Sequence, residues 1–207
     1  MQGDKIMENI KKEKNYYTFG MIKPDGMEHK QEIIKLILDA GLKISYYKCA
    51  MLTDDIIDEN YSHVKEKFPK DFNLLKESLK SGPVLMMLIF DQKGNAVENY
   101  RKVLGTTKSW EADPNSIRGK FGDKEKIYKN VAHGSGSIKE AGDEVIRFFG
   151  KEIFNVFDSL VWSAKYEEAL LNDGYFNSYD FIKKYVDEQT IRLIDEACLN
   201  FKNKKGE

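Results

Sequence analysis

The residues best suited to chemistry lie at positions 130–137, with the sequence NVAHGSGS. His133 stands between a short apolar segment and small residues, and Ser137 with Glu140 gives the capping-box pattern that begins a helix. The amino-terminal end of a helix exposes unpaired backbone N–H groups, which favour an anion such as phosphate. An imidazole held there could attack phosphorus as a nucleophile, although a single histidine beside glycine and serine is more often a loop or capping residue.

Cationic side chains elsewhere in the chain could meet such an anion. Lys23 follows the first predicted strand, Arg101 lies on a predicted helix, and Arg118 lies in a long polar loop. Each alone is typical of a solvated surface charge, but together with Asn130 they supply the donors that a polyphosphate needs. The chain has no Walker A or Gly-x-Gly-x-x-Gly pattern, and residues 134–137 lack the spacing of a serine nucleophile elbow.

Composition and charge indicate a globular protein with one ordinary domain and an appendage. The 207 residues are 41% hydrophobic and 32% charged, with a net charge of −1. No overall field therefore attracts nucleic acid or a membrane surface, and the longest apolar run, residues 84–90, is too short to span a bilayer. Cys49 and Cys198 are far apart in sequence, which favours a reducing compartment. Residues 1–14 lack the apolar segment of a secretory signal, so the expected location is cytoplasmic.

Alternating strands and helices must position these residues. Apolar, β-branched and aromatic stretches predict strands at 16–22, 42–52 and 84–90, and a fourth strand in the segment that holds His133. Apolar residues at helical spacing predict helices around residues 33–38, 56–64, 72–79, 96–104 and 138–150. Thr53 is expected to cap the second of these, and residues 106–126 to form a polar loop. Helices between only four strands predict an α+β fold of ferredoxin-like type, with helices packed on a four-stranded antiparallel sheet.

The chain changes character after Gly150. Apolar residues expected to pack back on the domain are Phe154, Phe157, Leu160, Val161 and Trp162. Residues 178–202 are predicted to form one amphipathic helix, with an apolar stripe of Ile182, Val186, Leu193, Ile194, Ala197 and Phe201. Such a stripe indicates packing against the same chain or a neighbouring subunit, and a dedicated partner is the alternative. The predicted organisation is a polar leader at 1–15, a main domain at 16–150 and a helical extension at 151–207.

Four short motifs occur in the order found in one known family. They are Lys-Pro-Asp-Gly at 23–26, Ser-Gly-Pro at 81–83, Ile-Arg-Gly at 117–119 and Asn-x-x-His-Gly-Ser at 130–135. In this order the chain resembles the nucleoside diphosphate kinases over residues 16–150. Each motif alone is weak evidence, whereas all four in register are specific. The resemblance implies an enzyme that reversibly transfers the γ-phosphate of a nucleoside triphosphate to a nucleoside diphosphate, in a ping-pong cycle through a phosphohistidine and with broad base specificity.

The resemblance assigns roles to individual residues. His133 matches the phosphorylated histidine, Glu144 the glutamate that orients it, and Ser135 a serine bonded near the same centre. The positions that match residues binding the phosphates and the sugar are Lys23, Tyr61, Arg101, Thr107, Arg118 and Asn130. The aromatic that stacks on the base is Phe68 or Phe72, and Phe72 is included among the expected site residues. Mg²⁺ is implied to ride on the β- and γ-phosphates of ATP and the other nucleotides, so no metal cage of protein carboxylates is expected.

Several features depart from the usual pattern of this family. An acidic residue usually follows His-Gly-Ser, but this chain has Gly136, which puts a metal-linked or helix-capping contact in doubt. The segment between Tyr61 and Ser81 is slightly longer, the turn after residues 23–26 lacks an Arg-Gly pair, and Trp110 lies where a polar residue is usual. A homo-oligomer is implied, but not its size. These departures support an alternative function, that of a catalytically weak or inactive kinase-like scaffold acting through its C-terminal helices.

Overall fold

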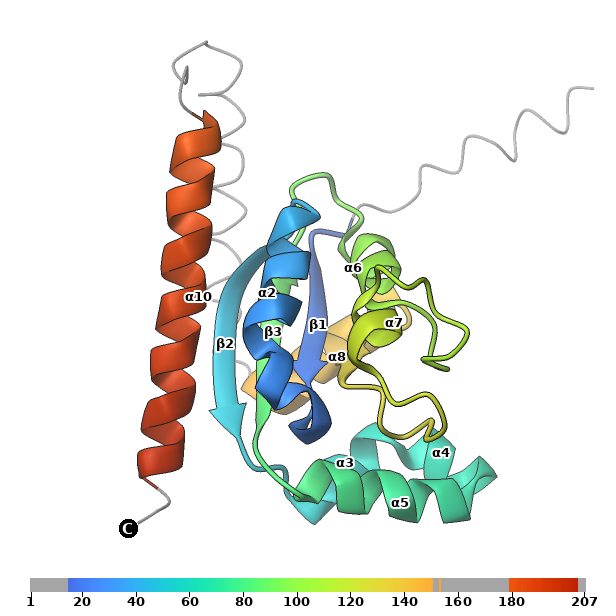
Figure 1. Ribbon diagram of the computed structural model, residues 1–207. Helices are drawn as coiled ribbons and strands as arrows, with labels where there is room; N and C mark the ends of the chain where they lie inside the picture. The colour runs from blue at the N-terminus through green and yellow to red at the C-terminus, as the bar shows by residue number, and fades with distance from the viewer. Residues whose placement is uncertain (1–14, 151–152, 154–178, 205–207) are drawn as a thin grey trace, which may run out of the picture.

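A single sheet forms the centre of the computed structural model, which describes residues 15–150, residue 153 and residues 179–204. The strands are β1 (Tyr17–Ile22), β2 (Lys43–Ala50), β3 (Val84–Phe90) and β4 (Ala132–Gly134). They are ordered β2-β3-β1-β4, and each neighbouring pair is antiparallel. The predicted four-stranded antiparallel sheet with helices packed on it is confirmed (Figure 1).

Helices cover both faces of the sheet (Figure 1). On one face lie α2 (Lys30–Asp39) and α6 (Ala96–Leu104), which also contact each other, and on the other face α8 (Ile138–Phe149) packs against β1. One end of the molecule carries α3 (Asp54–Asn60), α4 (Ser62–Lys67) and α5 (Pro69–Lys80). The remaining short elements are the 3-10 helix η1 (Pro24–His29) and α7 (Ile117–Phe121).

The strand β3 is buried on both of its faces, as its continuous apolar sequence predicts. Leu85, Met87 and Ile89 belong to the apolar cluster beneath α2 and α6. The alternate residues of the same strand face the cluster formed with α5 and α8, which also contains Phe19 and Met21 of β1. The inner strands β1 and β3 therefore fix the middle of the sheet, and they support β4 at one edge.

Three local predictions differ from the structure. The single helix expected over 56–64 is two helices, because Tyr61 has φ −111° and ψ 24° and interrupts the helix between α3 and α4. The expected polar loop at 106–126 contains α7, whose amino-terminal end is capped by Ser116 through a 3.1 Å bond from the N–H of Gly119. The turn expected at 23–26 continues as η1. The caps expected from Thr53 and Ser137 are both present.

The C-terminal helix α10 (Tyr179–Asn203) packs against α2 and β2 of the same chain. The predicted stripe is partly wrong, since Leu193 is 48% exposed while Ile194 and Cys198 are buried. An ion pair of 2.6 Å between Lys30 and Asp195 also joins α10 to α2. Ile182, Val186 and the apolar residues between 154 and 162 lie outside the described side chains, so their predicted packing stays a prediction.

The two cysteines of the chain meet in the folded protein. Cys49 on β2 and Cys198 on α10 are free thiols that lie near each other, Cys198 in the apolar cluster beneath α2 and Cys49 packed against it. Distance in sequence therefore did not predict their distance in space, because α10 returns to the edge strand of the sheet. Of the helices in the described ranges, none is both long and apolar enough to cross a membrane.

Candidate active site

The strand β4, at one edge of the sheet, places His133 beside the inner strand β1. His133 pairs with Met21 of β1, and Val131, two residues before His133, has φ 59°, a conformation that β-branched residues rarely adopt. The turn is held from both sides, since the Val131 N–H donates to Asp25 Oδ2 at 3.0 Å and its carbonyl accepts from the Lys23 N–H at 2.8 Å. A Cβ at Gly26 would lie 2.5 Å from the Val131 carbonyl, so this approach requires glycine.

The imidazole of His133 is fixed by a buried carboxylate. Its Nε2 lies 2.6 Å from Glu144 Oε1, and Ser135 Oγ donates to Glu144 Oε2 at 2.6 Å. A carboxylate accepts hydrogen bonds, so Nε2 carries the proton of the neutral imidazole and Nδ1 retains its lone pair. The predicted helix start after Ser137 brings Glu144 back to the histidine, and the three residues assigned to catalysis lie together.

The charge of Glu144 is stabilised by three donors. Besides His133 and Ser135, Asn60 Nδ2 donates to Oε1 at 3.1 Å. Burial acts to raise the pKa of Glu144, but these hydrogen bonds outweigh burial and hold the pKa below its ordinary value. Asn60 was not among the predicted site residues. No sequence motif marks it, since only the fold brings the end of α3 to α8.

Lys23 is a buried cation at the end of β1. Its Nζ donates to Asn130 Oδ1 at 2.6 Å and to the Tyr128 carbonyl at 3.3 Å. Burial lowers the pKa of Lys23 to about 8, although the charge of Asp25 opposes the shift. The lysine therefore stays mainly charged at neutral pH but loses its proton just above it, and an anion nearby would favour the charged form.

Arg118 is a second buried cation close to His133. Its guanidinium donates to the carbonyl of Ala132 at 3.0 and 3.3 Å and to that of Gly105 at 3.1 Å. Among the described residues no carboxylate pairs with it. Burial lowers the pKa of Arg118 to about 10, and the charge of Arg101 adds to this effect. Two cations held by carbonyl and amide oxygens alone form a site that an anionic group would neutralise.

Tyr61 lies beside the imidazole of His133. Its ring meets the ring of His133 edge to face, with 5.7 Å between centroids. Its hydroxyl is buried near Asn60 and has no hydrogen bond of good geometry to any described residue. Burial raises the pKa of Tyr61, so the hydroxyl stays protonated and can donate to a ligand.

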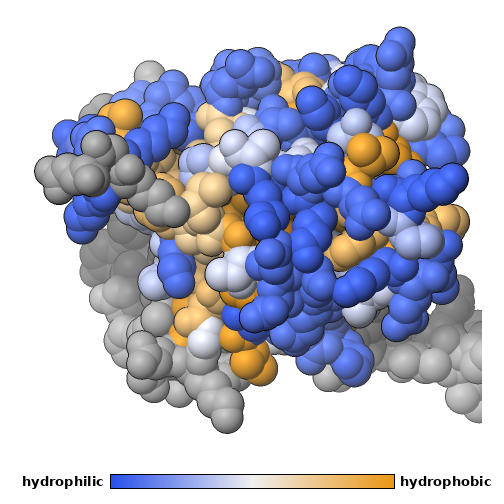
Figure 2. Space-filling model, turned by 90° about the horizontal axis from the view of Figure 1, so that it is seen from below, coloured by the Kyte–Doolittle hydropathy of each residue, from blue (hydrophilic) through white to orange (hydrophobic). Residues whose placement is uncertain are grey.

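The two aromatics considered for base stacking differ in exposure. Phe72 is only 3% exposed and belongs to the apolar cluster beneath α5, so in this structure it offers no free ring face. Phe68, between α4 and α5, is 58% exposed. Figure 2 views the molecule from below, the side on which Figure 1 draws α3 to α5, and shows a mainly hydrophilic surface with smaller apolar areas. Phe72 thus lies in the core while Phe68 presents an exposed ring, and the identity of the stacking aromatic stays a prediction.

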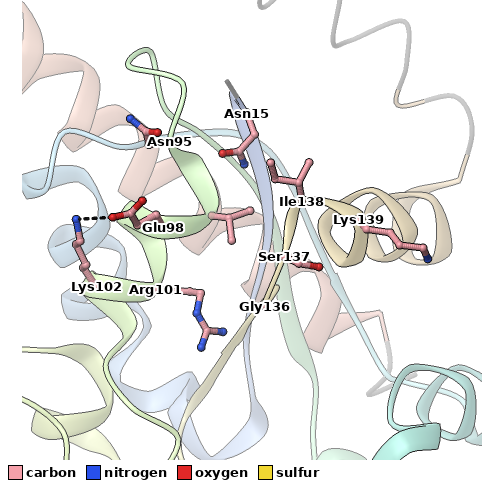
Figure 3. Close-up of a pocket in the computed structure, with 10 residues that line it drawn as sticks. Asn15, Asn95, Glu98, Arg101, Lys102, Gly136, Ser137, Ile138 and Lys139 are labelled. Atoms are coloured by element: carbon pink, nitrogen blue, oxygen red, sulfur yellow. Dashed lines mark ion pairs between the residues drawn. The ribbon is translucent and has the colours of Figure 1, made fainter. Parts of the chain in front are cut away.

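Arg101 and Thr107 lie at the exposed border of the site. Thr107 contributes its carbonyl, which accepts from Asn130 Nδ2 at 3.2 Å, and its side chain is exposed. Arg101 lines a cavity of about 740 Å³ between the starts of α6 and α8, together with Gly136, Ser137 and Lys139 (Figure 3). His133, Lys23 and Arg118 do not line this cavity, so it adjoins the histidine site and does not contain it.

Glu140 occupies the space next to Gly136. Its Oε2 accepts from the Gly136 N–H at 2.8 Å and lies 2.8 Å from the position that a Cβ of residue 136 would take. Arg101 Nη1 is 3.6 Å from the same position. The Glu140 carboxylate, in the first turn of α8, thus lies where an acidic side chain at position 136 would lie.

Among the described residues, one group of side chains brings potential metal-ligand atoms together beside His133. Ligand atoms of His133, Glu140 and Glu144 lie within 4.8 Å of one another. The carboxylate oxygens are, however, engaged by hydrogen bonds, with two donors on Glu144 Oε1 and one on each of Glu144 Oε2 and Glu140 Oε2. Mg²⁺ prefers free oxygen ligands in octahedral geometry, so this cluster fits an orienting role better than a Mg²⁺ cage.

Comparisons with known proteins give the same family from sequence and from structure. The family model described as nucleoside diphosphate kinase matches residues 16–154. A nucleoside diphosphate kinase of Oceanobacillus iheyensis is 36% identical over 134 residues, which are 64% of this chain and 86% of that protein. A crystal structure of a nucleoside diphosphate kinase from Encephalitozoon cuniculi matches with a TM-score of 0.61 at 29% identity, covering 67% of this chain and 91% of that one.

A longer relative also matches. The thioredoxin domain-containing protein 6 of Xenopus laevis is 36% identical over 159 residues, which are 72% of this chain. The match covers 24% of that protein, so the chain spans about a quarter of this relative's length.

Proposed function

Since the chain belongs to the nucleoside diphosphate kinase family, we propose that it exchanges γ-phosphates between nucleoside triphosphates and diphosphates through a phosphohistidine at His133. One observation carries the proposal. The Nε2 of His133 is tied to buried Glu144, and the buried cations Lys23 and Arg118 are bonded to the residues just before it in the chain. A nucleophilic Nδ1 next to two unneutralised cations suits the transfer of a phosphoryl group.

The proposed reaction has two mirrored steps. Nδ1 attacks the γ-phosphorus, the bond from that phosphorus to the β–γ bridging oxygen breaks, and the nucleoside diphosphate leaves. In the second step a terminal oxygen of another diphosphate attacks the phosphorus, and the P–N bond breaks. Lys23, Arg118 and Arg101 would stabilise the charge on the phosphoryl oxygens, while Asn130, Thr107 and Tyr61 would bind the nucleotide. Mg²⁺ on the β- and γ-phosphates would supply further charge neutralisation.

Base recognition is proposed to rest on stacking. Phe68 is exposed at the end of the molecule that carries α3 to α5, and an aromatic face accepts any base. We therefore expect broad base specificity. A homo-oligomer, a cytoplasmic location and the domain limits of 16–150 remain proposals.

The alternative is an inactive scaffold that acts through the C-terminal helix. Its support was Gly136 together with the altered loops, and Glu140 fills the space beside Gly136. A scaffold also has no physical need for buried cations without carboxylate partners, which lower stability. Burial of Lys23 and Arg118 thus favours the enzyme.

The replacement of the acidic residue by Glu140 can be tested with two substitutions. Gly136→Asp alone should lower the exchange rate, because the new Cβ would lie 2.8 Å from Glu140 Oε2 and bring two carboxylates together. Glu140→Ala alone should also lower the rate. The double variant should be more active than either single variant, with a coupling of about 1 kcal/mol or more. Additive losses would contradict the replacement.

The lowered pKa of Lys23 predicts that nucleotide binding is coupled to proton uptake. With a pKa of about 8, Lys23 loses its proton as pH rises through this value, and bound phosphates favour the charged form. Nucleotide binding at pH 8.5 should therefore take up a proton, whereas binding at pH 6.5 should not, and affinity should fall with rising pH above 8. Calorimetry in buffers of different ionisation enthalpy measures the uptake. Equal proton exchange at both pH values would contradict the prediction.

The proposed function is tested by steady-state exchange between ATP and a second diphosphate. A ping-pong cycle gives parallel lines in double-reciprocal plots when one substrate is varied at several concentrations of the other. Intersecting lines would indicate direct transfer between two bound nucleotides. No exchange at all would favour the scaffold.

A further inference from the structure

A hydrogen-bond chain behind the catalytic histidine reaches from the site to the surface. Asn60, the last residue of α3, donates through Nδ2 to Glu144 Oε1 at 3.1 Å. Its Oδ1 accepts from Arg147 Nη1 at 2.8 Å, and Arg147 Nε donates to Glu59 Oε1 at 2.8 Å. The resemblance to the nucleoside diphosphate kinases assigns no role to Asn60 or Arg147.

The arginine determines which end of the amide faces the carboxylate. A guanidinium only donates, so Asn60 can meet Arg147 only with its oxygen. The NH₂ group is then directed to Glu144, as its 3.1 Å contact requires. Arg147 lies on the same helix as Glu144, one turn further on, and its side chain is 20% exposed. Asn60 thus links α3 to α8 next to the Glu144 carboxylate and donates a hydrogen bond to it.

The amide acts on the oxygen that also binds the imidazole. Oε1 receives both His133 Nε2 and Asn60 Nδ2, whereas Oε2 receives Ser135. Without Asn60, a buried carboxylate would lose one of three donors, its pKa would rise, and its side chain would be free to turn away from the imidazole. Both changes would weaken the preference for a proton on Nε2.

We propose that Asn60, oriented by Arg147, is a positioning residue that holds Glu144 in the geometry that keeps Nδ1 of His133 free for phosphoryl transfer. The inference rests on the proposed function of His133. A purely structural link between α3 and α8 is the competing interpretation. The two differ because a structural link affects stability alone, while a positioning residue also affects the imidazole and the pH dependence.

The test compares Asn60→Leu, Asn60→Asp and Arg147→Met with the control Lys65→Met. The control removes a 2.7 Å ion pair from Lys65 to Asp58 of α3, which is not part of the hydrogen bonds to Glu144. Asn60→Asp retains an acceptor for Arg147 but places a second negative charge beside Glu144. It should keep the contact with Arg147, yet lose more activity than Asn60→Leu, for which kcat should fall about tenfold with little change in KM. Arg147→Met should lie between wild type and Asn60→Leu.

The pH profile separates positioning from structure. Activity needs an ionised Glu144 and an unprotonated Nδ1 on His133, so the acidic limb reports the hydrogen-bonded His133–Glu144 pair. The acidic limb should therefore move to higher pH in both Asn60 variants, most in Asn60→Asp, and stay in place in Lys65→Met. Variants with lowered stability and an unmoved acidic limb would overturn the proposal.

A spectroscopic measurement tests the role of Asn60 independently of the proposed exchange activity. The chain has only three histidines, so ¹⁵N imidazole spectra of the nucleotide-free protein are resolvable, and His133→Gln assigns the relevant signals. Wild type should show the Nε2–H tautomer of neutral His133, and Asn60→Leu should show a mixture of tautomers. An unchanged tautomer in Asn60→Leu would overturn the inference. If wild type exchanged no phosphate but the tautomer shifted as expected, only the proposed function would fail.

Discussion

Replacing His133 with alanine is expected to abolish phosphate exchange. The variant removes the nucleophile itself, and loss of a nucleophile in other covalent enzymes lowers kcat by roughly 10⁴- to 10⁶-fold. The fold should persist, because the imidazole lies at the border of the site with 14% of its side chain exposed. Steady-state exchange and a thermal unfolding curve measure the two properties.

Nucleotide binding controls for this loss. His133→Ala should bind ATP with nearly unchanged affinity, since Lys23, Arg118 and Tyr61 remain in place. Exchange within tenfold of wild type would contradict the covalent mechanism. Loss of both binding and folding would instead indicate a structural role for the histidine, and His133→Gln would then repeat the test with a side chain closer in volume.

Replacing Lys23 with methionine should separate activity from stability. The substitution removes a donor to the transferring phosphoryl group, which typically lowers kcat about 10²- to 10³-fold. It also removes a buried charge whose pKa is lowered to about 8 by burial, so the folded state should become no less stable. The midpoint of thermal unfolding should therefore stay equal or rise while exchange nearly disappears.

The control for this variant is Lys108→Met. Lys108 is an exposed lysine that pairs with Glu111 at 3.0 Å. Its loss should change neither rate nor stability appreciably, because exposed ion pairs contribute little. A Lys23→Met enzyme that unfolds early, or one that keeps its full rate, would contradict the assignment of Lys23 to phosphate binding.

Local sequence signals predicted the central part of the fold. The β-branched and apolar residues of 16–22 and 84–90 specify the inner strands, and Thr53 and Ser137 mark helix starts through their capping side chains. These signals act over a few residues, so they are readable from the chain alone. Lys23 and Asn130 were predicted in one site, and a 2.6 Å bond joins them.

Contacts between distant elements were not predictable in the same way. Asn60 reaches Glu144 only because α3 and α8 meet in the folded chain, and nothing local distinguishes this asparagine from a solvated one. Glu140 carried a capping signal, but its place beside Gly136 depends on the rotation of α8. Phe72 and Phe68 have similar sequence surroundings and opposite exposures, because a helix buries one side and presents the other.

The central claim is tested most directly by trapping the phosphorylated protein. Purified protein is incubated with Mg²⁺ and ATP labelled on its γ-phosphate, and then chased with GDP. Wild type should acquire a label that is labile in acid and stable in base, that is absent from His133→Ala, and that leaves as GTP. A wild-type protein that binds ATP without acquiring label, or a label that persists in His133→Ala, would contradict the phosphohistidine mechanism.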